Sequence, residues 1–87
     1  MKVHAIEQLT KKDIPLYYRN EYAALGDIEF PGGNRQQVPV EFSVEIKPTG
    51  DRCIAVSVPS RIDYPLIPVI RALKDKIRTM EQEGELR

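Results

Sequence analysis

Apolar and polar positions alternate most regularly in the middle of the chain. In "VPVEFSVEIK", residues 38–47, every second residue is Val, Phe or Ile, and the residues between them are polar or proline. A period of two predicts a strand that is buried on one face and exposed on the other. Because Pro39 has no backbone N–H, we expect the start of this strand to lie at a sheet edge or beside a bulge.

The next segment, "KPTGD" at residues 47–51, predicts a three-residue hairpin loop with Gly50 in the left-handed position of a G1 bulge. This loop would bring the apolar faces of both strands to the same side of the sheet. The predicted register pairs Ile46 with Arg52, Val44 with Ile54, Phe42 with Val56 and Val40 with Val58. A four-residue loop would instead set valines against Cys53, Ala55 and Ser57, so the three-residue loop is favoured.

Two shorter segments lie upstream of this hairpin. "DIEF", residues 27–30, predicts a short strand that "PGGN" ends. "KVHAIEQL", residues 2–9, alternates weakly and predicts either a first strand or an extended arm. The sheet is therefore expected to have three strands, or four if residues 2–9 also pair.

A short helix is predicted between these two segments. "TKKD" has the spacing of a capping box, with Thr10 as N-cap and Asp13 three residues later. Gly26 would end the helix in a left-handed conformation, and Pro15 would occupy its first turn. The apolar face of this helix would consist of Ile14, Tyr18, Tyr22 and Leu25.

A longer helix is predicted from about Pro65 to Gln82, capped by Asp63 or Ser60 and ended by Gly84. Its apolar stripe has heptad spacing and comprises Leu66, Ile70, Leu73, Ile77 and Met80. Heptad spacing suits packing on a sheet of the same chain or on a second copy of the helix. Three glutamates in the last turn have the wrong sign for a helix C-terminus, so we expect the tail, residues 84–87, to fray.

Together these elements predict one α+β domain, a two-layer sandwich covering residues 1–87. Its layers would be an antiparallel three-stranded meander, with a possible fourth N-terminal strand, and two helices, a short N-terminal one and a long C-terminal one. A chain of 87 residues is long enough for one hydrophobic core and too short for two.

The order of helix, three strands and helix is similar to that of the double-stranded-RNA-binding domain. That family carries a lysine cluster where its second helix begins. The corresponding residues of this chain, "SRIDYPLIP" at 60–68, contain one Arg and one Asp. The resemblance therefore covers topology alone, and no functional residue of that family is carried over.

Charge and composition narrow the function classes. Thirteen basic and thirteen acidic residues leave no overall field to attract a polyanion or a membrane surface. No apolar run approaches the roughly 18 residues of a membrane span. The single cysteine, Cys53, and the lack of an export-like N-terminal segment favour the cytoplasm.

Catalytic and metal-binding patterns are not found in the sequence. His4 and Cys53 are each the only residue of their type, and neither HxxxH nor CxxC spacing occurs. In the predicted hairpin Cys53 lies opposite Glu45, whose charge disfavours a thiolate. We therefore predict a protein without catalytic activity, cofactor or metal.

Three groups of residues could contact an anion or a nucleic acid. The glycines of "PGGNR" permit a backbone nest, although the segment also suits an ordinary turn. An arginine lies among tyrosines in "YYRNEY", and three cations follow one face of the long helix, which also suits a solvated face. The candidates are Gly32, Gly33, Arg35, Arg19, Arg71, Lys74 and Arg78.

Two functions remain. The first is a small non-catalytic protein-interaction or regulatory module that self-associates, as a homodimer, through the long helix or a sheet edge. Its basis is a surplus of apolar surface over what three short strands can bury. The alternative is a small nucleic-acid-binding protein that uses the basic face of the long helix.

Overall fold

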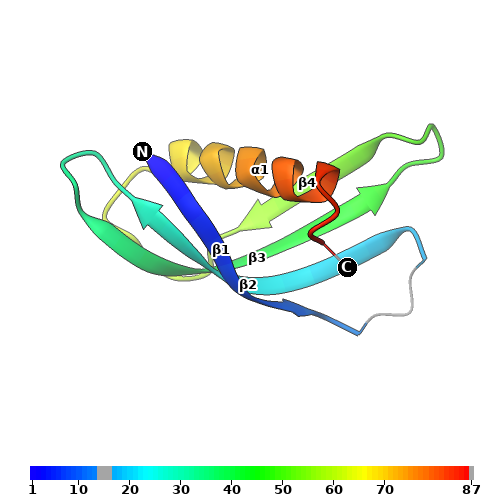
Figure 1. Ribbon diagram of the computed structural model, residues 1–87, viewed down its shortest axis with the longest axis horizontal. Coiled ribbons are helices and arrows are strands. Elements are labelled where there is room, and N and C mark those ends of the chain that lie inside the picture. The colour runs from blue at the N-terminus through cyan, green and yellow to red at the C-terminus, as the bar shows by residue number, and fades with distance from the viewer. Residues whose placement is uncertain (14–16, 87) are drawn as a thin grey trace.

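The computed structural model describes residues 1–13 and 17–86, which form a four-stranded antiparallel sheet covered on one face by one helix (Figure 1). The strands follow each other in chain order across the sheet, as a meander. The elements are β1 (Lys2–Lys11), β2 (Arg19–Glu29), β3 (Arg35–Ile46), β4 (Arg52–Ser57) and α1 (Leu66–Gln82).

The predicted N-terminal helix is wrong. Thr10, its expected cap, lies in β1, while Tyr22 and Leu25 lie in β2; Ile14 and Pro15 fall outside the described residues. The physical reason is a period of two that continues through the segment and outweighs the spacing of four. The buried residues of this segment are Tyr22, Ala24, Gly26, Ile28 and Phe30.

The double-stranded-RNA-binding topology requires a helix before the strands, so losing that helix also removes the likeness to that family. In its place the sheet gains a fourth strand, because residues 2–11 pair with β2. β1 is irregular: its register shifts between Val3 and Ala5 and again between Glu7 and Thr10. Gln8, inside the second shift, has a φ of 52°, the left-handed backbone typical of a bulge.

The hairpin between β3 and β4 has the predicted loop. Gly50 has a φ of 90°, and the N–H of Lys47 donates to the carbonyl of Asp51 at 2.8 Å. The predicted pairs Ile46–Arg52, Val44–Ile54 and Phe42–Val56 are confirmed, whereas β4 ends before Val58 could pair with Val40. Pro39 pairs with Leu25 of β2, and its other side lies beyond the end of β4. Its missing N–H is therefore tolerated.

Gly26 does not cap a helix but allows a close approach between the two layers. A Cβ at this position would lie 3.2 Å from Cγ2 of Val40 and 3.3 Å from Cδ2 of Leu73. A glycine in the middle of a strand commonly marks such an approach.

The face of α1 that packs on the sheet is rotated from the predicted stripe. Val69, Leu73, Ile77 and Met80 are its buried residues. Pro65 occupies the N-cap position and no side chain caps the helix, so neither Asp63 nor Ser60 has the predicted role. At the other end, the N–H of Gly84 donates to the carbonyl of Glu81 and the N–H of Glu85 to that of Met80. These two bonds form a Schellman motif.

Candidate functional site

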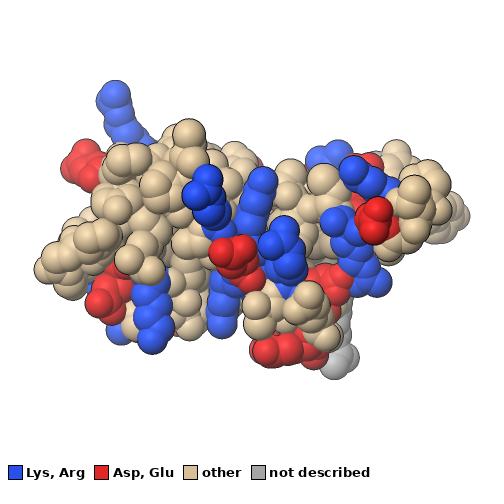
Figure 2. Space-filling model, turned by 90° about the horizontal axis from the view of Figure 1, so that it is seen from above, with Lys and Arg blue, Asp and Glu red and all other residues tan. Residues whose placement is uncertain are grey.

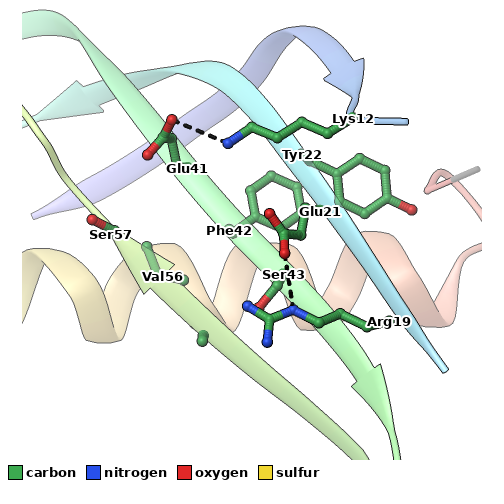
Figure 3. A pocket seen from close by; sticks show the side chains of 10 residues that line it. Lys12, Arg19, Glu21, Tyr22, Glu41, Phe42, Ser43, Val56 and Ser57 are labelled. Atoms are coloured by element: carbon green, nitrogen blue, oxygen red, sulfur yellow. Dashed lines mark hydrogen bonds and ion pairs between the residues drawn. The ribbon is translucent and has the colours of Figure 1, made fainter. Parts of the chain in front are cut away.

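The sheet face opposite α1 contains a shallow hollow of about 220 Å³ that spans β2, β3 and β4 (Figure 3). Charged side chains stand around it in pairs. Nζ of Lys12 lies 3.2 Å from Oε1 of Glu41, and Nε of Arg19 lies 3.1 Å from Oε2 of Glu21. Ser43, only 8% exposed, lies between these pairs.

This hollow is an ion-pair network rather than a phosphate site. Arg19, a predicted anion contact, also lies 3.9 Å from Glu45, so two carboxylates flank its guanidinium. Its Nε is buried and makes no well-aligned hydrogen bond with a described residue. An incoming phosphate would meet the carboxylates of Glu21 and Glu41 before it neutralised either cation. The two hydroxyls at the hollow, on Ser43 and Ser57, have no histidine beside them to act as a base.

The predicted anion nest forms the turn between β2 and β3. Gly32 and Gly33 both have positive φ, at 96° and 86°. The N–H of Gly33 is not free for a ligand, because it donates to the carbonyl of Phe30 at 3.1 Å. Arg35 is engaged as well: its guanidinium donates to both carboxylate oxygens of Asp27, at 2.8 and 2.7 Å. Arg35 therefore anchors the hairpin and does not point to an open nest.

The predicted basic residues of α1 do share an accessible surface. Arg71 and Arg78 are exposed and Lys74 is half-buried. Figure 2, which views α1 from its outer side, shows Lys and Arg side chains along the middle of this surface with acidic ones among them. Arg78 lies 3.4 Å from Asp75, whereas Arg71 and Lys74 form no ion pair within the described residues. We call Arg71, Lys74 and Arg78 the basic face of α1.

The five residues of the predicted apolar stripe separate into two groups. Leu73 and Ile77 are fully buried against the chain's own sheet, and Met80 is 7% exposed. These side chains are unavailable to a partner while the fold is intact. Leu66 remains 46% exposed and Ile70 is half-buried. The helix surface open to association therefore lies at the N-terminal end of α1.

The most open part of the sheet is the outer edge of β4. No described strand pairs with this side of β4. Residues 53–58, "CIAVSV", contain neither charge nor proline. We call this segment the open β4 edge. Strand edges of natural proteins usually carry charges, proline or bulges that prevent pairing with other chains.

The opposite edge of the sheet, β1, is protected in that way. It contains Lys2, Glu7 and Lys11 and the two register shifts described above. The two edges therefore differ in kind, because only the open β4 edge offers a regular ladder.

The backbone groups that the open β4 edge offers can be assigned from the hairpin. Lys47 and Asp51 form a hydrogen-bonded pair, and such pairs alternate with non-bonded ones along an antiparallel ladder. The N–H and C=O groups of Cys53 and Ala55 therefore face β3. Those of Ile54 and Val56 point outward, away from the sheet.

Apolar side chains border this edge. Ile54, Val56 and Val58 pack on the core but stay half-buried. Glu81 of α1 forms an ion pair with Arg52 of β4, which identifies the side of the helix over β4. Two isoleucines, Ile67 and Ile70, lie on that same side, within about 40° of Glu81 at 3.6 residues per turn, and Ile67 is 72% exposed.

Sequence reasoning considered an open sheet edge without identifying the strand. The uncharged run from Cys53 to Val58 was the available signal. Its edge position could not be read from the sequence, because another strand could have paired with β4.

Within the described part of the chain, no three His, Cys, Asp or Glu side chains lie close enough together to bind a metal ion. The described helix, α1, is neither long nor apolar enough to cross a membrane.

Comparison with known families gives one match. Residues 1–82 match the model of the BB_0187 family, so the match covers nearly all of the chain, and the chain belongs to that family. No curated protein and no solved structure matches it significantly.

Proposed function

We propose that this family member is a non-catalytic protein-interaction module that associates with itself through the open β4 edge. The observation that carries this proposal is the contrast between the two sheet edges. The outer side of β4 is regular and uncharged, whereas β1 is bulged and charged. An unprotected edge forms backbone hydrogen bonds with another strand readily, and C2 dimers are the commonest homo-oligomers.

Surface composition next to the edge also supports this proposal. Ile54 and Val56 are half-buried, and Ile67 is 72% exposed on the same side of the molecule. Covering them would remove apolar surface from water at about 25 cal/mol per Å².

The test is the absolute molar mass, measured by light scattering over a hundredfold range of protein concentration. We expect twice the chain mass at high concentration and dissociation on dilution. Val56→Pro should abolish association, because it removes an outward N–H, whereas Val56→Ala keeps that donor and should weaken association less. A mass of one chain at every concentration would overturn the proposal. Circular dichroism must show that both variants remain folded.

A second candidate function is nucleic-acid binding by the basic face of α1. It is favoured by Arg71 and Lys74, which have no ion-pair partner among the described residues. Titration with mixed oligonucleotides at about 50 and 200 mM salt tests it, since phosphate contacts predict an affinity that falls steeply with salt. An Arg71→Gln/Lys74→Gln variant should then bind more weakly. Absence of binding at the lower salt would exclude this function.

A further inference from the structure

We propose that the partner of the open β4 edge is the same edge of a second copy, paired antiparallel about a twofold axis beside Val56. This inference rests on the proposed self-association and adds to it the partner strand and the register. The two sheets would then join into one, with both helices on the same face.

The register follows from which residues share a face. Residues directly opposite each other in an antiparallel pair project to the same side of the sheet. Only Ile54, Val56 and their even-numbered neighbours direct backbone groups outward, so these residues must form the new hydrogen-bonded pairs. The twofold axis must therefore pass beside an even-numbered pair, or between two of them at an odd-numbered residue.

An axis beside Val56 matches every apolar side chain of the edge with another. Val56 lies opposite Val56 of the partner copy, and Ile54 lies opposite Val58 of the partner copy. These side chains all face α1 and are all half-buried in the single chain. Pairing would cover the flank that each leaves exposed.

An axis beside Ala55 is the nearest alternative, and it fits less well. It would set the charged Arg52 against the apolar Val58 of the partner copy. The Val56 axis instead brings Asp51 toward Arg61 of the partner copy, at both ends of the ladder. Neither Asp51 nor Arg61 forms an ion pair with a described residue, so this register adds opposite-charge contacts that the single chain lacks.

Pro59 does not interfere with this pairing. By the same alternation, an odd-numbered residue directs its backbone nitrogen toward β3. The missing N–H of Pro59 would therefore not remove an outward donor. The ladder can extend symmetrically from Ile54 to Val58, with each copy contributing the same backbone groups.

Disulfide trapping tests the register directly. In a Cys53→Ser background, the Val56→Cys variant would place its thiol opposite its own symmetry copy. Directly opposed residues of a hydrogen-bonded pair have Cα atoms about 5.5 Å apart, within the range of a disulfide. We expect mild oxidation to yield a covalent dimer of this variant. The matched Ala55→Cys variant, in the same background, should stay uncrosslinked, because its two copies would lie about 8 Å apart.

A spin label on the native thiol gives an independent measurement. Cys53 is the only cysteine and is exposed. In the proposed register the two copies of Cys53 are offset by six residues, so their Cα atoms should lie about 20 Å apart at 3.3 Å per residue. An axis beside Ala55 predicts about 14 Å, and parallel pairing about 5 Å.

The outcomes separate this inference from the proposed function. Trapping of Val56→Cys but not Ala55→Cys, with a separation near 20 Å, supports the register. Trapping of Ala55→Cys alone overturns the register and leaves self-association standing. A wild-type dimer that traps neither variant also overturns this inference. A wild-type monomer overturns both the inference and the proposed function.

Discussion

Gly26 of β2 lies against Leu73 of α1 so closely that a Cβ on Gly26 would come within 3.3 Å of Cδ2 of Leu73. The same Cβ would lie 3.2 Å from Cγ2 of Val40. Leu73 and Val40 are 0% and 1% exposed, so the core around them leaves little room to yield. The contact between the two layers at this point depends on the absence of a side chain.

Gly26→Ala should destabilise the fold by about 1 kcal/mol. Overpacking a core typically costs about 1 to 3 kcal/mol, and the lower chain entropy of the unfolded alanine variant offsets about 0.4 to 1 kcal/mol of that. In a Leu73→Ala background the added methyl group has room, so the same change should be neutral or stabilising. Urea unfolding of the four proteins in this double-mutant cycle measures the coupling. Equal effects in both backgrounds would contradict the contact.

Leu73→Ala alone should cost about 2 to 5 kcal/mol, the usual range for a leucine in a packed core. Leu66 was predicted on the same stripe but is 46% exposed. Leu66→Ala should therefore cost well under about 1 kcal/mol of folding stability. Chemical denaturation compares the two variants. Similar losses would mean that the helix packs on the predicted stripe rather than on Val69.

Acid should weaken the hairpin between β2 and β3. The hydrogen bonds from Arg35 lower the pKa of Asp27 below its ordinary value. The unfolded chain then binds a proton more readily than the folded one, so the stabilisation is present above about pH 4 and is lost as the pH falls through the lowered pKa. Asp27→Asn should be less stable than the wild type at about pH 7 and lose less stability between about pH 5 and 2.

Thermal melts of both proteins across this pH range test the Asp27 prediction. Glu29 is a second source of acid sensitivity, because the hydrogen bond from His4 lowers its pKa. Glu29→Gln is therefore the matched control, and some acid sensitivity should survive in each single variant. Identical acid profiles for Asp27→Asn and the wild type would contradict the role of the Arg35 pair.

Alkali should act on Tyr22. Burial raises the pKa of its hydroxyl above the ordinary value of 10.0, and the charge of Glu81 raises it further. The unfolded tyrosine ionises first, so this contribution to stability is complete below about pH 10 and is lost as the pH rises toward the folded pKa. Tyr22→Phe should lose less stability between about pH 9 and 11. Denaturant midpoints at these pH values, with Tyr17→Phe at an exposed site as the control, test this expectation.

Local patterns were sufficient for the hairpin and the long helix. The loop of the β3–β4 hairpin has a conformation that Gly50 favours, and alternation fixes which residues of β3 and β4 are opposite each other. α1 begins within one residue of the predicted start and ends at Gln82 as predicted. In each case residues that are neighbours in the sequence determine the geometry.

The N-terminal third was mispredicted because two periodicities compete there. Tyr18, Tyr22 and Leu25 fit a helix, whereas Tyr22, Ala24 and Ile28 fit a strand. Pairing with β3 along the whole of β2 decides between them. That pairing is a contact between distant parts of the chain, which single-sequence patterns do not report.

The sequence by itself determined the antiparallel hairpin, the length of the C-terminal helix and the lack of a recognisable metal or catalytic motif. The tertiary structure decided which face of α1 is buried, that Arg35 is engaged by Asp27, and that β4 lies at an open edge. The physical reason is that periodicity shows a residue to be apolar or polar on one face of its own element. What that face meets depends on elements far away in the chain.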